Sequence, residues 1–351
     1  MFADLSAAAL RRLDPETAHG LAITALKTLP LPAPPADDSI LKTTIAGLSL
    51  PNPIGLAAGL DKNAEALRGL SRLGFGFVEC GSVTPLAQAG NTKPRLFRLS
   101  EDRAIINRMG FNNAGLEAFA AHLLTRPART IVGGNLGANK QTEDRAADYV
   151  VGLQRLAGLA DYFTVNISSP NTPGLRALQG RAALDDLLGR VAEARTPADS
   201  APAPVFLKIA PDLTASEIAM IVEAALAHRI DALIVSNTTL DRPDSLTAPD
   251  RAEAGGLSGA PLADRALAAL RHAAEAAQGR LPLIGVGGIA SGLDAYRRIR
   301  AGASAVQIYS ALIYDGPGLV ARIKRDLAAH LRADGLSSIA EAVSAGPLTE
   351  R

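Results

Sequence analysis

The hydrophobic positions of this 351-residue chain fall mostly in short, continuous apolar runs rather than in an alternation of polar and apolar residues. Continuous runs of this length are typical of strands buried on both faces of a parallel sheet. Eight such runs recur, separated by Ala-, Leu- and Arg-rich stretches of helical pattern, and they begin near Pro53, Phe77, Ile131, Tyr162, Val205, Ala232, Leu283 and Ala305. Eight strands that alternate with helices predict an α/β fold of the (β/α)₈ TIM barrel type.

The segments between the strands support this arrangement. Residues 216–226, for example, begin with a serine suited to a helix N-terminus and carry an apolar stripe. Two strand-to-strand intervals are unusually long, Phe77 to Ile131 and Ala232 to Leu283. We expect their extra sequence to form excursions over one mouth of the barrel.

The chain before the first strand has a different pattern, which predicts an N-terminal amphipathic helical extension. Leu5, Ala9 and Leu13 share one face of a first short helix, and Asp14 followed by Pro15 begins a second. A proline-rich stretch, residues 29–35, predicts a stiff linker. We therefore divide the chain into a helical segment with its linker, residues 1–36, and a barrel domain, residues 37–351. The helices either pack on the barrel or lie as a hairpin in a membrane surface.

Composition excludes several classes of protein. Lys and Arg number 36 against 35 Asp and Glu, and no block of like charges appears, so nothing indicates nucleic acid or an acidic partner. The one cysteine, Cys80, excludes an internal disulfide and is expected to be buried, and the five histidines lack the spacing of metal ligands. No apolar run approaches the ~20 residues of a membrane span, and no signal-peptide pattern is present. We expect an intracellular protein that is not transmembrane and holds no metal.

Two segments concentrate carboxamide and hydroxyl groups. Residues 166–174 follow an apolar strand and carry Asn166, Ser168, Ser169 and Asn171 between prolines that restrict the backbone. A turn that satisfies its own backbone is one interpretation of this loop. Residues 107–113 add three more carboxamides around a glycine and a phenylalanine, which favours a ligand site.

Polar residues also gather at the C-terminal ends of the predicted strands, which form the catalytic face of a (β/α)₈ barrel. Lys208 lies inside an apolar run, where a cation is costly unless it meets an anion, an electron-rich ligand or an ion-pair partner. Residues 285–288 are glycine-rich and follow the seventh strand, and Tyr309 and Ser310 follow the eighth. Bare backbone N–H groups and a hydroxyl suit a phosphate there, although a tight turn explains the glycines equally well.

These residues together resemble the dihydroorotate dehydrogenases, and in particular their quinone-dependent, membrane-associated class (class 2). The matching motifs cover essentially the whole chain: residues 14–19, 52–62, 81–85, 94–98, 107–113, 166–176, 236–239, 255–259 and 285–310. The resemblance implies an FMN-dependent oxidoreductase that converts (S)-dihydroorotate to orotate in de novo pyrimidine (UMP) biosynthesis.

The resemblance also implies a role for each matching position. One FMN would be held by Ala58, Gly59, Lys62, Ser82, Asn135, Asn166, Lys208, Ser236, Gly259, Gly288, Tyr309 and Ser310. Dihydroorotate would be held by Lys62, Asn107, Arg108, Met109, Gly110, Phe111, Asn166, Asn171, Asn237 and Thr238. The quinone route would pass His19, Arg98 and Tyr309. Ser169 would be the catalytic base, at a position where the soluble class of the family carries cysteine.

The implied reaction removes a proton from C5 of dihydroorotate and delivers hydride from C6 to the flavin, which passes electrons to ubiquinone or menaquinone. Because serine is a poor base, Ser169 should need a relay, with Thr172 or Thr238 as candidates. Lys208 would lie beside the charge that builds on the reduced flavin. The resemblance further implies a monomer, peripheral on the cytoplasmic face of a bacterial inner membrane.

Three alternatives stay open at this point. The first two are other FMN barrels: a soluble dihydroorotate dehydrogenase and a dihydrouridine synthase that acts on RNA. The RNA enzyme is disfavoured because the chain has no basic RNA-binding segment. A catalytically silent barrel used as a scaffold on a membrane surface is the third, and a flavin that copurifies would count against it.

Overall fold

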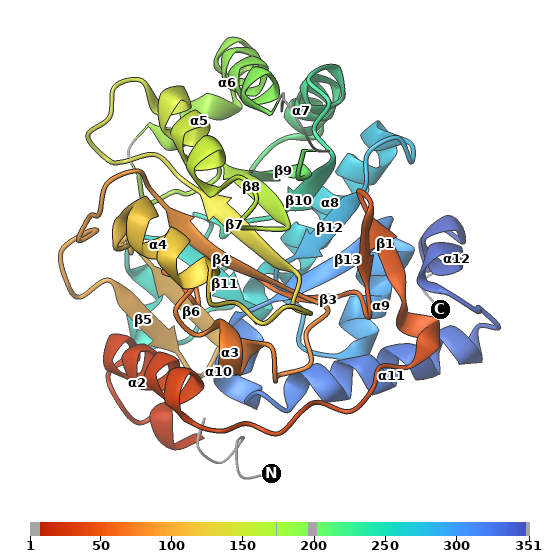
Figure 1. Ribbon diagram of the computed structural model, residues 1–351. Helices are drawn as coiled ribbons and strands as arrows, with labels where there is room; N and C mark the ends of the chain where they lie inside the picture. Colours follow the sequence, from red (N-terminus) through yellow and green to blue (C-terminus); the bar gives the residue numbers. More distant parts are fainter. Residues whose placement is uncertain (1–7, 173, 196–201, 349–351) are drawn as a thin grey trace.

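The centre of the computed structural model, which describes residues 8–172, 174–195 and 202–348, is a closed barrel of parallel strands (Figure 1). Strands that pair in the barrel also follow one another in the sequence, and the last strand pairs with the first. The barrel strands are β3 (Ile54–Leu56), β4 (Phe77–Val83), β7 (Val132–Leu136), β8 (Tyr162–Asn166), β9 (Val205–Ile209), β10 (Ala232–Val235), β12 (Leu283–Val286) and β13 (Ala303–Ile308). The predicted (β/α)₈ barrel is therefore confirmed, with all eight strands at the expected places.

Helices surround the barrel on its outer side (Figure 1). They are α3 (Leu67–Leu70), α4 (Gly115–Leu123), α5 (Arg145–Leu156), α6 (Arg181–Ala194), α7 (Ala215–Ala227), α8 (Ala263–Ala277), α9 (Gly292–Arg300), α10 (Ser310–Asp315), α11 (Leu319–Ala333) and α12 (Ile339–Ser344). In α7, the predicted N-terminal serine is not the cap. Thr214 caps the helix and forms a capping box with Glu217, which satisfies two backbone N–H groups at once.

The two long intervals form the predicted excursions at one end of the barrel. The first contributes β5 (Leu96–Leu99) and β6 (Ala104–Asn107), and the second contributes β11 (Gly256–Gly259). These strands pair into an antiparallel sheet in the order β11-β6-β5 and enclose a small apolar core of their own. At the other end of the barrel, a hairpin of β1 (Thr43–Ile45) and β2 (Leu48–Leu50) buries Ile45 and Leu50 against the inner side chains of the barrel.

Residues 5–7 of the first predicted N-terminal helix lie outside the described residues, and residues 8–10 of it are helical. The second predicted helix is present as α2 (Pro15–Thr28). Asp14 caps α2, as predicted, by accepting a hydrogen bond from the Thr17 N–H at 2.9 Å. One face of α2 packs on α3 and β5. A Cβ atom on Gly69 of α3 would lie 2.1 Å from the carbonyl oxygen of Leu26, so this contact is made backbone to backbone.

The other face of α2 and its flanks expose large apolar side chains. Leu13, Leu21 and Leu29 are 42%, 47% and 58% exposed. Both interpretations of this segment therefore retain support, because one face packs on the barrel and the other is left to solvent or lipid. Among the described residues, no helix combines the length and the apolar character needed to cross a bilayer.

The barrel interior contains one buried carboxylate at the centre of a polar network. Glu79 of β4 has no exposed surface, and Cys80 beside it is also buried, as predicted. Four uncharged donors from β7, β8 and β13 reach the Glu79 carboxylate: Asn135 at 2.7 Å, Gln307 at 2.8 Å, Thr164 at 3.1 Å and Tyr162 at 3.2 Å. The Lys208 ammonium, on β9, lies 4.0 Å away. Burial lowers the pKa of Lys208, and the Glu79 charge opposes that shift.

The Glu79–Lys208 pair gives a prediction about stability. Glu79→Gln should lower the free energy of unfolding by about 3–5 kcal/mol, because it leaves Lys208 as an uncompensated buried cation. The double variant with Lys208→Met should recover part of this loss, since it removes both charges together. Urea unfolding followed by circular dichroism measures both. A Glu79→Gln protein as stable as the wild type would contradict the pairing.

Candidate active site

A single cavity of about 900 Å³ joins the C-terminal mouth of the barrel to α2. At the α2 end it is lined by Ala18, His19 and Ala22, and at the far end by Ser169 and Asn171. Between these ends, the walls are the loops and strand ends on the catalytic face of the barrel. The geometry therefore connects the helical segment to the carboxamide-rich loops through one continuous space.

The structure gathers nearly all of the predicted site residues around this cavity. Its lining includes His19, Ala58, Gly59, Lys62, Ser82, Arg98, Asn107, Met109, Gly110, Phe111, Asn166, Ser169, Asn171, Lys208, Ser236, Asn237, Thr238, Gly259, Gly288, Tyr309 and Ser310. Asn135 stands just behind this wall and contacts it through Ser82. The side chain of Arg108 instead lies over the Phe97 ring and pairs with Glu253 at 2.6 Å, so the structure does not bring it into the cavity.

Carboxamides and hydroxyls tie together the C-terminal ends of five strands, β4, β6, β7, β8 and β10. The Asn166 amide donates to Ser82 Oγ at 2.9 Å and to Asn135 Oδ1 at 3.2 Å. The Asn237 amide donates to Ser168 Oγ at 2.9 Å. The Asn171 amide donates to Asn107 Oδ1 at 3.2 Å. These contacts leave further donor and acceptor positions on the same side chains for a planar polar ligand.

Lys62 supplies a positive charge to the same cavity. Its ammonium donates to the carbonyl of Gly59 at 2.5 Å. Burial, and then the nearby charge of Arg95, lower the pKa of Lys62 to about 8. An anionic ligand would favour the charged form of this lysine, so the site is suited to a carboxylate.

Ser169 faces the cavity but has few partners. It is nearly buried, and its Oγ accepts a hydrogen bond from the Asn171 N–H at 3.2 Å. Thr172, one of the two predicted relay residues, has a buried Oγ with no hydrogen-bond partner in the described part of the chain. A buried hydroxyl without a hydrogen bond destabilises the fold, so this hydroxyl is suited to bind a water molecule or a ligand in the working protein.

The α2 end of the cavity is polar only at a few points. His19 donates from Nε2 to the carbonyl of Leu60 at 2.8 Å, and burial lowers its pKa to about 4, which keeps the ring neutral. Arg98 donates to the carbonyls of Arg11 and Leu13, at 2.7 and 3.1 Å, and so holds the chain that leads into α2. The surrounding alanine and leucine side chains of α2 make this end suited to an apolar molecule with polar atoms at one edge.

The sequence reasoning missed two residues of this region. Glu79 supports Lys208 from within the barrel, and Gln307 lines the cavity with an Oε1 that has no partner among the described residues. Both could have been found by the signal that identified Lys208, a strongly polar residue inside an otherwise apolar strand.

Comparisons with known proteins agree with this geometry. The family model described as dihydroorotate dehydrogenase matches residues 40–331. The protein "Dihydroorotate dehydrogenase (quinone)" of Rhodospirillum rubrum is 56% identical over 338 residues, which cover 95% of this chain and 91% of that protein. The protein of the same name from Rhodopseudomonas palustris (strain BisA53) is 55% identical over 348 residues, 98% of this chain and 96% of that protein.

A solved structure is also similar over nearly the whole length. The crystal structure of DHODH from Eimeria tenella in complex with ferulenol superposes with a TM-score of 0.90 at 41% identity, covering 94% of this chain and 95% of that chain. The matches to the two curated relatives and to this structure cover 95%, 98% and 94% of the chain. The chain therefore belongs to the dihydroorotate dehydrogenase family, in its quinone-dependent class.

Proposed function

We propose that the protein oxidises (S)-dihydroorotate to orotate in pyrimidine biosynthesis, using one bound FMN and a membrane quinone, ubiquinone or menaquinone, as the final oxidant. The observation that carries the proposal is the single cavity, which places a polar, carboxamide-lined end and an apolar end in one continuous space. A reaction that takes electrons from a polar ring and delivers them to a lipid-like acceptor needs both ends.

The residues in the middle of the cavity fit FMN. Gly287, Gly288 and Ser310 offer backbone N–H groups and a hydroxyl suited to the phosphate. Lys208 places a cation on the wall of the same space, and Gln307 places there an acceptor that has no partner among the residues that the structure describes. When bound, FMN accepts hydride from the substrate and passes electrons to the quinone. The protein groups hold it: Lys208 stabilises negative charge, and Glu79 keeps Lys208 charged.

The carboxamide end fits dihydroorotate, which combines a carboxylate with a cyclic ureide. Asn107, Asn166, Asn171 and Asn237 can match the ureide donor for acceptor, and Lys62 can pair with the carboxylate. Ser169 removes the C5 proton, and the Thr172 hydroxyl, which has no partner among the described residues, is suited to pass it on. The Arg108 side chain, which pairs with Glu253, has no part in this proposal.

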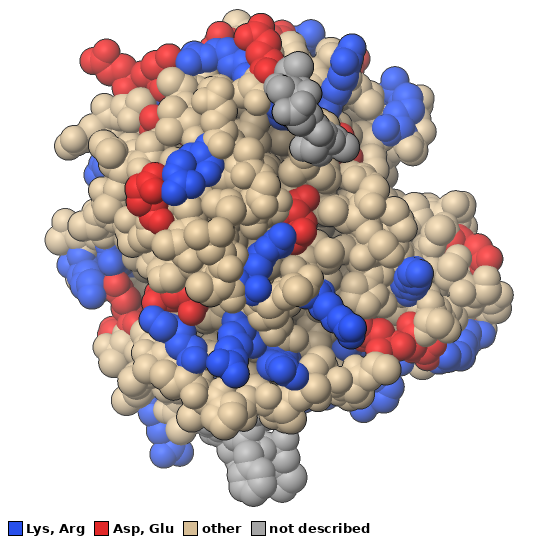
Figure 2. All heavy atoms as spheres, viewed as in Figure 1, with Lys and Arg blue, Asp and Glu red and all other residues tan. Residues whose placement is uncertain are grey.

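The α2 end fits the quinone and its membrane. The neutral His19 and the Arg98 guanidinium supply the polar contacts, and Tyr309 lines the same cavity. The exposed Leu13, Leu21 and Leu29 can enter the interfacial region of a bilayer. Several Lys and Arg side chains lie on the lower part of the face in Figure 2, where α2 and the linker run in Figure 1, and can attract anionic headgroups. We infer a monomer, peripheral on the cytoplasmic face of the inner membrane.

Replacement of the base tests the chemistry directly. Ser169→Ala should retain FMN but slow its reduction by dihydroorotate by a factor of ~10²–10⁴, the usual contribution of a positioned base. Anaerobic stopped-flow bleaching of the flavin measures this rate. Bleaching of the variant at close to the wild-type rate would mean that another group takes the proton.

The lowered pKa of Lys62 predicts a pH dependence of ligand binding. Below about pH 8 the ammonium is charged and should pair with the carboxylate of orotate, and above it the affinity should fall, by up to about tenfold per pH unit. Titration of the FMN-bound protein with orotate between pH 6 and pH 10 measures this. Lys62→Met should bind more weakly and lose the dependence. An unchanged profile in that variant would assign the titration to another group.

The close contact between α2 and α3 allows the quinone end to be disturbed separately. Gly69→Ala should push α2 away from the barrel, because its Cβ would overlap the Leu26 carbonyl. Flavin bleaching by dihydroorotate should be nearly unchanged, while reoxidation by a long-chain quinone slows several-fold. Gly20→Ala is the matched control, since a Cβ there has no atom within 4 Å. If both variants were reoxidised by quinone at the same rate, α2 would not be part of the quinone route.

A further inference from the structure

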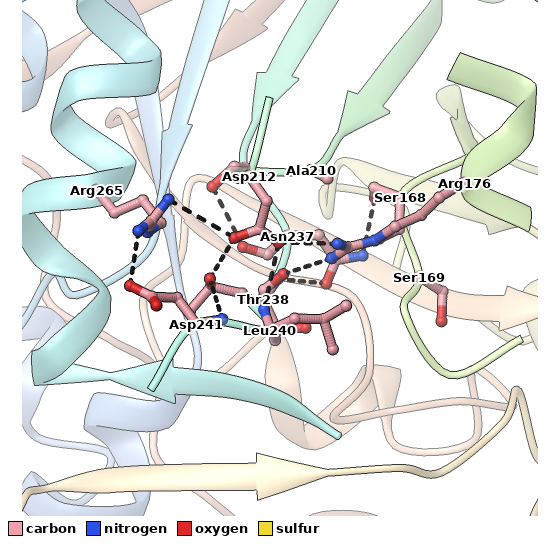
Figure 3. A network of polar contacts seen from close by, with 12 residues as sticks. Ser168, Ser169, Arg176, Ala210, Asp212, Asn237, Thr238, Leu240, Asp241 and Arg265 are labelled. Carbon is pink, nitrogen blue, oxygen red and sulfur yellow. Dashed lines mark hydrogen bonds and ion pairs between the residues drawn. The ribbon is translucent and has the colours of Figure 1, made fainter. Parts of the chain in front are cut away.

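One guanidinium connects three of the loops at the substrate end of the cavity. Arg176 lies in the 3₁₀ turn Leu175–Gln179, directly after the loop that carries Ser169. Its Nε donates to the carbonyl of Ser168 at 3.1 Å, and its Nη2 donates to the carbonyl of Thr238 at 3.0 Å. Its Nη1 donates to Asp212 Oδ2 at 2.8 Å (Figure 3). The loops after β8, β9 and β10 therefore meet at this side chain.

Asp212 fixes the orientation of that guanidinium. The Asp212 carboxylate also accepts hydrogen bonds from the Thr239 hydroxyl and, at 3.3 Å, from the Leu240 N–H. The Arg176 and Asp212 side chains are only 22% and 23% exposed, so their ion pair is shielded from solvent. Arg265 is more peripheral, with Nη1 3.9 Å from Asp212 and its main ion pair to Asp241 at 2.6 Å.

Neither Arg176 nor Asp212 is among the residues that line the cavity. Both act on groups that do. The Ser168 carbonyl, which Arg176 binds, begins the peptide bond to Ser169, and the Ser168 hydroxyl accepts from Asn237. Thr238, whose carbonyl is the other acceptor, lines the cavity itself. Figure 3 shows Ser169 farther along its loop than Ser168, away from the guanidinium.

We propose that Arg176, oriented by Asp212, is a positioning residue for proton abstraction, because it fixes the carbonyls of Ser168 and Thr238 and thereby holds Ser169 Oγ against the substrate. This rests on the proposed function of Ser169 as the base. Displacement of a reacting group by about 1 Å can cost ~10²-fold in rate, so a second layer that prevents it contributes to catalysis without touching the ligand.

The experiment compares two half-reactions in four variants of the FMN-bound protein. Arg176→Met and Asp212→Ala should each slow flavin bleaching by dihydroorotate about 10- to 100-fold. Reoxidation by quinone and the FMN content should stay at wild-type levels. Asp212→Asn should keep most of the rate, because the amide oxygen can still accept from Arg176 in the place of Oδ2, while the amide NH₂ faces the Thr239 hydroxyl oxygen. Arg265→Gln, the matched control, should leave the rate unchanged. If Arg176→Met fails to hold FMN, Arg176→Lys takes its place, and the comparison then depends on Asp212→Ala and Arg176→Lys.

A double variant separates positioning from a general structural effect. In a Ser169→Ala background, Arg176→Met should add little further slowing, because no base is left to position. If it slows Ser169→Ala as much as the wild type, or if it slows quinone reoxidation equally, the proposal is overturned while the base assignment stands. A Ser169→Ala protein with the wild-type bleaching rate would instead remove the base assignment itself.

Discussion

The architecture of this protein depends on keeping one positive charge inside an apolar barrel. Lys208 is buried in a strand whose other residues are apolar, and a lone ammonium there would lose its proton or destabilise the fold. Glu79 provides the counter-charge, and its own oxygens need donors, which β7, β8 and β13 provide. The charge on the cavity wall is thus supported by side chains from four other barrel strands. A change in the register of any of them would remove a partner that the others cannot replace.

Much of this could be predicted from local pattern. Continuous apolar runs identified the barrel strands, and the polar residues that end them identified most of the cavity wall. The pattern at Asp14 and Pro15 gave the start of α2 correctly because capping is a local property. The serine at the start of α7 misled, because the two-residue difference between Thr214 and Ser216 depends on which hydroxyl reaches the N3 backbone.

Features that depend on distant contacts could not be predicted in the same way. The β1–β2 hairpin consists of strands of three residues each, and only the barrel core that they close gives them a reason to form. The periodicity of α2 predicted an apolar stripe but not its partner, since the close approach at Gly69 depends on a helix far along the chain. The contacts of Arg176 could not be predicted from its own segment, because its acceptors come from three separate loops.

The buried state of His19 has a consequence at a charged interface. A bilayer with anionic lipids has a surface potential of about −30 mV, which raises the local proton concentration and lowers the local pH by about half a unit. A histidine with an ordinary pKa would change its charge as the lipid composition changed. With a pKa of about 4, His19 stays neutral across that range. If the protein works at a membrane, as proposed, the apolar end of the cavity would therefore present the same hydrogen-bonding pattern whatever the charge of the lipids.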